Sequence, residues 1–160
     1  MDTADALRDR LGAVVRGAAG SASADRLCRA CVELLDVDGA AISLIHAGSA
    51  PGTVGSSGEV GRRVDELQLA LGEGPCLDSI RQEAAVMVPD FEAAAAGRWP
   101  AFAGAAGGLG IRALFALPIG AATTWIGALD LFRTTPGPLS PAGLAGGRWA
   151  ADRRRCRCST

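Results

Sequence analysis

The residue best placed for chemistry is Cys76, which ends the run GEGPC at residues 72–76. Proline is favoured as the first residue of a helix, so Cys76 is expected in a first helical turn. Unpaired N–H groups and the helix dipole at that end favour a thiolate, which would suit a redox-sensing or ligand-contacting thiol. The alternative, which the pattern favours, is a small buried hydrophobe that packs beneath the glycine turn.

The other cysteines and the single histidine indicate structure rather than chemistry. Cys28 and Cys31 form a C-x-x-C pair on the apolar side of an expected helix, where core packing is the better interpretation. Cys156 and Cys158 form a C-x-C pair that lacks the ligand spacing of a zinc ribbon. His46 is interpreted as a polar residue at a strand end rather than a metal or haem ligand. The sequence therefore predicts no metal site.

Acidic residues are scattered, and none has the spacing or context typical of general acid–base catalysis. Asp78 in a first helical turn complements the helix dipole, and Asp90 fits the start of a loop. Asp130 alternates with Ala128 and Phe132 in an expected strand, so its side chain could point into a pocket. The chain has no lysine, which excludes a Walker phosphate loop. No catalytic residue is predicted.

Composition limits the class of protein. The 160 residues fit one domain, and a hydrophobic fraction of 49% is enough for a core. Residues 1–147 carry 11 arginines against 16 acidic residues, whereas residues 148–160 carry 5 against 1. The mildly acidic body does not favour nucleic-acid binding. The chain has no long apolar run and a charged N-terminus, so we expect a cytoplasmic protein without a membrane span.

Hydrophobic spacing predicts a mixture of helices and strands. Helices are expected over residues 3–17, 23–35, 59–71 and 75–81. Strands are expected over residues 40–45, 85–88, 111–119 and 123–132, with a weak strand near Thr53. The last two strands are expected to pair as an antiparallel hairpin, and residues 92–108 to form a loop and one helix. A closing helix is expected to begin near Ser140, but the amphipathic spacing typical of a helix is lost after Gly147.

Four segments together resemble a known family. The segments LQLALGEGPCLD (67–78) and VMVPDF (86–91) are followed by LGIRALFALPI (109–119) and WIGALDLF (125–132). In this order they resemble a GAF domain of the actinobacterial kind that precedes an ANTAR RNA-binding domain in transcription antitermination regulators. The resemblance implies an α+β fold, with a GAF-like, PAS-related antiparallel sheet of about six strands. Helices would cover one face of this sheet, and a small-molecule pocket would lie on the other.

The resemblance divides the chain into an N-terminal helix (1–20), a GAF-like sensor domain (22–146) and an aberrant basic tail (147–160). The tail is too short for an ANTAR helical bundle, so no RNA-binding domain is expected in this chain. Its abrupt richness in arginine and cysteine indicates a shifted reading frame or a truncation, and a natural disordered basic tail is the alternative. Attraction of the tail to nucleic-acid phosphates is a weaker interpretation.

The function that the resemblance implies is non-catalytic sensing of an unknown small molecule or of a redox signal. Phe91 and Trp99 would be candidate pocket walls, with core packing as an equal alternative, and Arg112 would be a candidate partner for an anionic group. The candidate pocket residues are therefore Cys76, Asp78, Asp90, Phe91, Trp99, Arg112 and Asp130. A homodimer through the N-terminal helix is expected.

The alternative function is a GAF-fold thiol enzyme that reduces free methionine sulfoxide, with Cys76 as the attacking thiol. A cyclic-nucleotide site is disfavoured because the chain lacks lysine. A bilin site is disfavoured because His46 lies far from Cys76 in the sequence. No cofactor is assigned.

Overall fold

A computed structural model describes residues 21–46, 52–119, 125–141 and 143–144. Its centre is an antiparallel sheet of five strands in the order β2-β1-β5-β4-β3. The strands are β1 (Gly39–His46), β2 (Gly52–Ser56), β3 (Val86–Val88), β4 (Ala113–Ile119) and β5 (Trp125–Arg133). The antiparallel sheet and the β4–β5 hairpin are confirmed, with five strands among the described residues where about six were expected.

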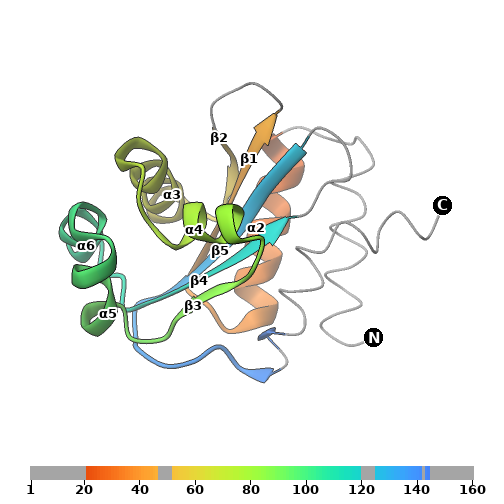
Figure 1. Ribbon diagram of the computed structural model, residues 1–160. Coiled ribbons are helices and arrows are strands. Elements are labelled where there is room, and N and C mark those ends of the chain that lie inside the picture. Colours follow the sequence, from red (N-terminus) through yellow and green to blue (C-terminus); the bar gives the residue numbers. More distant parts are fainter. Residues whose placement is uncertain (1–20, 47–51, 120–124, 142, 145–160) are drawn as a thin grey trace.

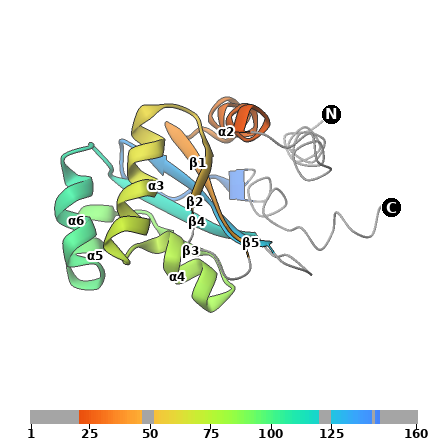
Figure 2. The same cartoon turned by 90° about the horizontal axis from the view of Figure 1, so that it is seen from above.

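Helices cover both faces of this sheet. Helix α2 (Ser21–Leu35) packs on one face, and α3 (Glu59–Leu71) and α4 (Pro75–Gln82) pack on the other (Figures 1 and 2). Two short helices, α5 (Phe91–Arg98) and α6 (Pro100–Gly107), lie beside α3 and α4. The face expected to hold a ligand pocket is therefore covered by α3 and α4.

The segment expected to form a loop and one helix forms two helices, α5 and α6. Trp99 separates them, because its backbone angles of φ −138° and ψ 72° are not helical. Pro100 then begins α6, since a proline at the first helical position loses no hydrogen bond and has a suitable φ. The carboxylate of Glu73 accepts the backbone N–H of Phe102 at 2.9 Å, which satisfies a donor in the first turn of α6.

Side chains along the central strands point alternately to the two faces of the sheet, so a separate hydrophobic core forms on each face. On β4 and β5, Phe115, Leu117, Leu129 and Leu131 belong to the core beneath α2. Leu114 and Phe132 belong with α3, α5 and α6 on the opposite face. Successive side chains of a strand point to opposite faces, so Asp130 shares the second face with Phe132. Its neighbours on the adjacent strands are Ala41 and Ala116, whose small side chains leave room for a carboxyl group.

The C-x-x-C pair lies in the core beneath α2. Cys28 and Cys31 are both 0% exposed and pack against the sheet. Burial raises the pKa of Cys31 to about 12 and that of Cys28 further, so both thiols stay protonated. The packing interpretation of this pair is confirmed.

Some expectations fall on residues outside the described ranges. The N-terminal helix at 3–17, the homodimer through it and the tail at 147–160 stay predictions. His46 ends β1, but its side chain lies outside the described part. The Ser140 hydroxyl accepts the N–H of Gly143 at 3.0 Å, which fits the expected cap of a closing helix. No helix among the described residues is long and apolar enough to cross a membrane.

Candidate functional site

Five of the buried polar or titratable side chains lie between the sheet and the helices α3 and α4 and form one group. They are Ser43 on β1, Asp65 and Gln68 on α3, Cys76 on α4 and Asp130 on β5, each at most 1% exposed. We call these five residues the polar cluster. Burying polar and ionisable groups costs free energy unless they are paired, so such a cluster at one point of a fold is a candidate functional site.

The orientation of α3 places two members of the cluster, and it differs from the expected orientation. Hydrophobic spacing predicted an apolar face of Val60, Val64, Leu67 and Leu71. The side that the structure buries consists of Gly61, Val64, Asp65 and Gln68. Val60 and Leu71 are 40% and 41% exposed. A Cβ at Gly61 would lie 2.7 Å from the carbonyl oxygen of Ala40, so this glycine lets α3 approach β1 closely.

Gln68 connects α3 to both α4 and the sheet. Its Oε1 accepts the backbone N–H of Cys76 at 2.8 Å, and its Nε2 donates to Oδ2 of Asp130 at 2.8 Å. The N–H of Cys76 belongs to the first turn of α4, where helical N–H groups have no partner within the helix. Gly74 makes the contact possible, since its φ is 138° and a Cβ there would lie 2.4 Å from Oε1 of Gln68.

Asp65 and Asp130 form a closely spaced pair of carboxyl groups. Oδ2 of Asp65 accepts a hydrogen bond from the hydroxyl of Thr53, and Oδ2 of Asp130 accepts one from Gln68. Burial and then repulsion from Asp65 raise the pKa of Asp130 well above its usual value, and burial raises the pKa of Asp65. A proton retained by Asp130 can donate to Asp65, which gives the pair a hydrogen bond that two carboxylates lack.

The Cys76 thiol lies within the cluster, with its Sγ atom 3.2 Å from Oγ of Ser43. Cys76 is in the first turn of α4, as the sequence predicted. Burial, followed by the negative charges of Asp130 and Asp65, raises the pKa of this thiol well above its usual value. Burial and the nearby carboxyl groups therefore disfavour the thiolate that was the less favoured of the two interpretations. The thiol is buried, as the alternative held, but it has polar neighbours.

Two of the predicted residues join α4 to the helices beside it. Asp78 accepts the indole N–H of Trp99 at 3.0 Å. It also lies 3.7 Å from the guanidinium of Arg81 and 3.9 Å from that of Arg98. Trp99 is 2% exposed and packs in the core beneath α5 and α6. Both residues therefore hold helices together and do not belong to the polar cluster.

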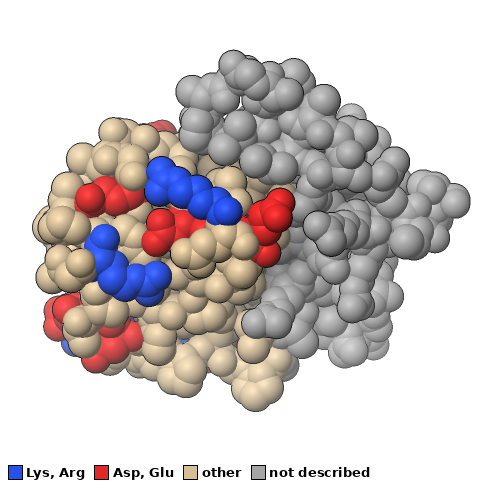
Figure 3. All heavy atoms as spheres, viewed as in Figure 1, with Lys and Arg blue, Asp and Glu red and all other residues tan. Residues whose placement is uncertain are grey.

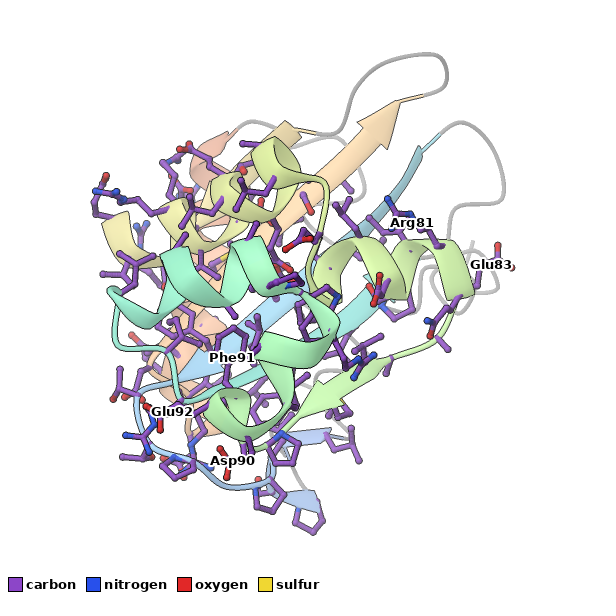
Figure 4. All side chains as sticks on the ribbon, turned by 60° about the vertical axis from the view of Figure 1, so that its left-hand side comes forward. Arg81, Glu83, Asp90, Phe91 and Glu92 are labelled. Carbon is purple, nitrogen blue, oxygen red and sulfur yellow. The ribbon has the colours of Figure 1, made fainter. Side chains whose placement is uncertain are left out.

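The last three predicted residues lie around the start of α5. Asp90 and Phe91 are labelled there in Figure 4, and the backbone carbonyl of Arg112 accepts the N–H of Phe91 at 2.9 Å. Phe91 is 2% exposed and packs edge-on against Phe102, with ring centroids 5.6 Å apart. Asp90 is an exposed N-cap whose carboxylate accepts an N–H in the first turn of α5. Arg112 forms an ion pair with Glu92 at 3.4 Å. Of the predicted site residues, therefore, only Cys76 and Asp130 belong to the polar cluster.

Sequence reasoning missed Ser43, Asp65 and Gln68. Asp65 and Gln68 stand three residues apart in the predicted helix directly before the GEGPC turn, so they share one face with Val64. That spacing was a usable signal. Ser43 lay in an apolar strand, and no pattern in the sequence separated it from a packing residue.

Charges on the surface are mixed. On the face drawn in Figure 3, basic and acidic side chains of the described residues lie next to one another. Arg81 and Arg98 lie beside Asp78, and Arg112 lies beside Glu92. The described residues on this face therefore do not form the extended basic patch that nucleic-acid binding favours.

Comparison with known proteins identifies the family. The model of the GAF domain family matches residues 22–145. The chain belongs to the GAF domain family. No curated protein matches the chain. This match does not distinguish GAF domains that precede an ANTAR domain from other GAF domains.

Solved structures show the same GAF fold. The GAF domain of a phosphoenolpyruvate-protein phosphotransferase from Coxiella burnetii has a TM-score of 0.65 and 16% identity, covering 98% of this chain and 96% of that chain. The phycocyanobilin-bound GAF domain of a cyanobacterial phytochrome has a TM-score of 0.65 and 12% identity, covering 99% and 93%. The type II free methionine-R-sulfoxide reductase of Thermoplasma acidophilum has a TM-score of 0.64 and 16% identity, covering 91% and 90%. The similar structures thus include both sensors and enzymes, and the fold does not choose between them.

The raised pKa of Asp130 predicts how the free energy of unfolding depends on pH. The measurement uses chelator-treated protein, so that no metal ion contributes to the stability. Ionising Asp130 opposes folding once the pH exceeds the unfolded-state value of about 3.9. In Asp130→Asn, the amide oxygen can accept from Gln68 and the amide N–H can donate to Asp65. We expect this variant to be about as stable as the wild type near pH 3.5 and more stable at pH 7–8, by urea unfolding.

The matched control for that measurement is Asp90→Asn, which keeps an N-cap residue outside the cluster. It should leave stability nearly unchanged at both pH values. A destabilised Asp130→Asn protein at pH 7–8 would show that Asp130 is held there as a carboxylate.

Proposed function

We propose that this chain is a non-catalytic sensory GAF domain whose signal, a small molecule or a redox change, acts at the polar cluster. The observation that carries the proposal is the buried carboxyl pair of Asp65 and Asp130 beside the thiol of Cys76. Apolar side chains at such positions commonly make a core equally or more stable. A role in binding or signalling would account for the presence of ionisable groups there.

The cluster is connected in a way that suits signal transmission. Gln68 holds the first turn of α4 and also bonds Asp130 on the central strand β5. A change in charge or occupancy at Asp130 or Cys76 would therefore alter how α3 and α4 pack on the sheet. Buried polar networks of this kind are sensitive to the state of each member.

Two features of the described residues argue against the alternative, a thiol enzyme that reduces free methionine sulfoxide. Attack on a sulfoxide requires a reactive thiol, but burial and the two carboxyl groups raise the pKa of Cys76. The other described cysteines, Cys28 and Cys31, lie in the core on the opposite face of the sheet. Neither of them can reach Cys76 to resolve an oxidised intermediate without unfolding.

The sensory assignment predicts that the purified chain will not reduce free methionine-R-sulfoxide with dithiothreitol as the reductant. Methionine formation by the wild type should equal that by Cys76→Ser and by buffer, as measured by chromatography. Turnover by the wild type that is lost in Cys76→Ser would establish the enzyme and overturn the sensory proposal.

The proposed transmission through Gln68 predicts the hydrogen exchange of α4. Gln68→Ala removes the acceptor for the N–H of Cys76, so amides in the first turn of α4 should exchange about tenfold faster or more. Gln82→Ala, at the exposed end of the same helix, is the matched control and should leave this turn unchanged. Unchanged exchange in Gln68→Ala would show that the amide does not connect the two helices.

We further propose that the sensory signal regulates transcription antitermination through an ANTAR output. The support is the order of the GEGPC, VPD, GIR and GALDLF motifs in this sequence. Reading the coding DNA beyond codon 140 in the three forward frames tests this proposal. We expect one frame to continue into a closing helix and an ANTAR-like helical domain. The absence of such a frame would remove the support for an antitermination role.

A further inference from the structure

Three potential metal ligands converge in the polar cluster from three different elements. Asp65 on α3, Cys76 at the start of α4 and Asp130 on β5 each offer a ligand atom, and these atoms lie within 4.8 Å of one another. In a tetrahedral zinc site, bonds of about 2.0–2.3 Å place neighbouring ligand atoms about 3.3–3.8 Å apart. Small side-chain adjustments would therefore suffice to place all three around one ion.

The two carboxyl groups also have the partner pattern expected of metal ligands. Oδ1 of Asp65 and Oδ1 of Asp130 are buried with no hydrogen-bond partner. The other oxygen of each group is held by a donor, from Thr53 for Asp65 and from Gln68 for Asp130. In metal sites, donors of this kind orient the ligating carboxylates. A proton shared between the two acids would satisfy these oxygens, but a metal ion would satisfy them and also bind the sulfur.

No cationic side chain of the described residues pairs with either buried acid. The arginines that form ion pairs do so with Glu66, Asp78 and Glu92, which lie outside the cluster. The whole chain contains no lysine. No side chain of the described part of the chain therefore supplies a positive charge to balance these two acids when they ionise.

The combination of donor atoms selects the type of cation. Calcium and magnesium are bound by oxygen ligands alone, whereas a thiolate with carboxylates suits a borderline transition metal such as zinc, iron or cobalt. Closed structural zinc sites use four protein ligands. With three protein ligands, the cluster would leave a coordination position for an exogenous molecule, as sites that bind or sense ligands require.

We propose that Asp65, Cys76 and Asp130 together bind one divalent transition-metal ion. The ion joins α3, α4 and β5 and becomes the point at which the domain detects its signal. The sequence predicted no metal site because these residues are far apart in the chain and follow no ligand-spacing motif. The regulatory meaning of the ion rests on the proposed sensory function, but its binding can be measured separately.

The test uses cobalt(II) as a spectroscopic probe with the full chain, after removal of metal with a chelator. One equivalent of cobalt should bind with a sulfur-to-cobalt charge-transfer band in the near ultraviolet. Cys76→Ser should lose this band, and Asp130→Asn should weaken cobalt binding by at least about tenfold. Asp130→Asn keeps the neutral hydrogen bonds of the cluster and serves as the second variant if Cys76→Ser fails to fold.

The matched controls are the other cysteines. The band should persist in Cys28→Ala and in a variant with both Cys156→Ser and Cys158→Ser. No band in the wild type, a band that survives in folded Cys76→Ser, or a band lost in the double variant would each overturn the metal site.

The same samples separate the metal proposal from the sensory one. Cobalt binding that slows exchange of the α3 and α4 amides supports both proposals. Cobalt binding without any change in exchange confirms the site but counts against its regulatory role. Failure to bind cobalt, with the Gln68→Ala exchange result as expected, overturns the metal site alone.

Discussion

The side-chain amide of Gln68 makes the bonds on which the arrangement of this domain's functional face depends. One end of the amide caps the helix that carries Cys76, and the other end bonds to Asp130 on the central strand. The contact requires Gly74, because a Cβ there would overlap the glutamine side chain. The GEG turn between α3 and α4 therefore does more than reverse the chain. It brings two helices and the sheet to one buried point.

The sheet separates two layers of side chains, one beneath α2 and one beneath α3 and α4, which differ in polarity. The layer beneath α2 is apolar, and even its cysteines, Cys28 and Cys31, act as small hydrophobic residues. In the layer beneath α3 and α4, the polar cluster buries two acids, an amide, a hydroxyl and a thiol. Packing in the first layer can supply much of the stability that the second layer loses through its buried polar groups. A GAF domain can in this way hold a costly site without losing its fold.

The elements were largely predictable from the sequence because periodicity and turn residues carry local information. The bounds of α3 and the place of Cys76 in the first turn of α4 both agree with the predictions. The rotation of α3 was not predictable from hydrophobic spacing. It depends on the contact of Gly61 with β1, which faces Asp65 inward and leaves Val60 exposed. Whether the thiol ionises depends first on its burial and then on Asp130 and Asp65, and both the burial and the proximity of these acids arise only in the folded chain.

The pairing of β5 with its neighbours has a consequence for how the chain folds. Asp130 stands between Leu129 and Leu131, which face the apolar layer. A slip of one residue in the register of β5 would turn this carboxyl group into the layer beneath α2, away from Gln68. Misregistered sheets would thus be penalised by a buried carboxyl group that has no hydrogen-bond partner. Burial of Asp130 lowers the stability of the native site, but the same residue also disfavours wrong strand pairings while the β4–β5 hairpin forms.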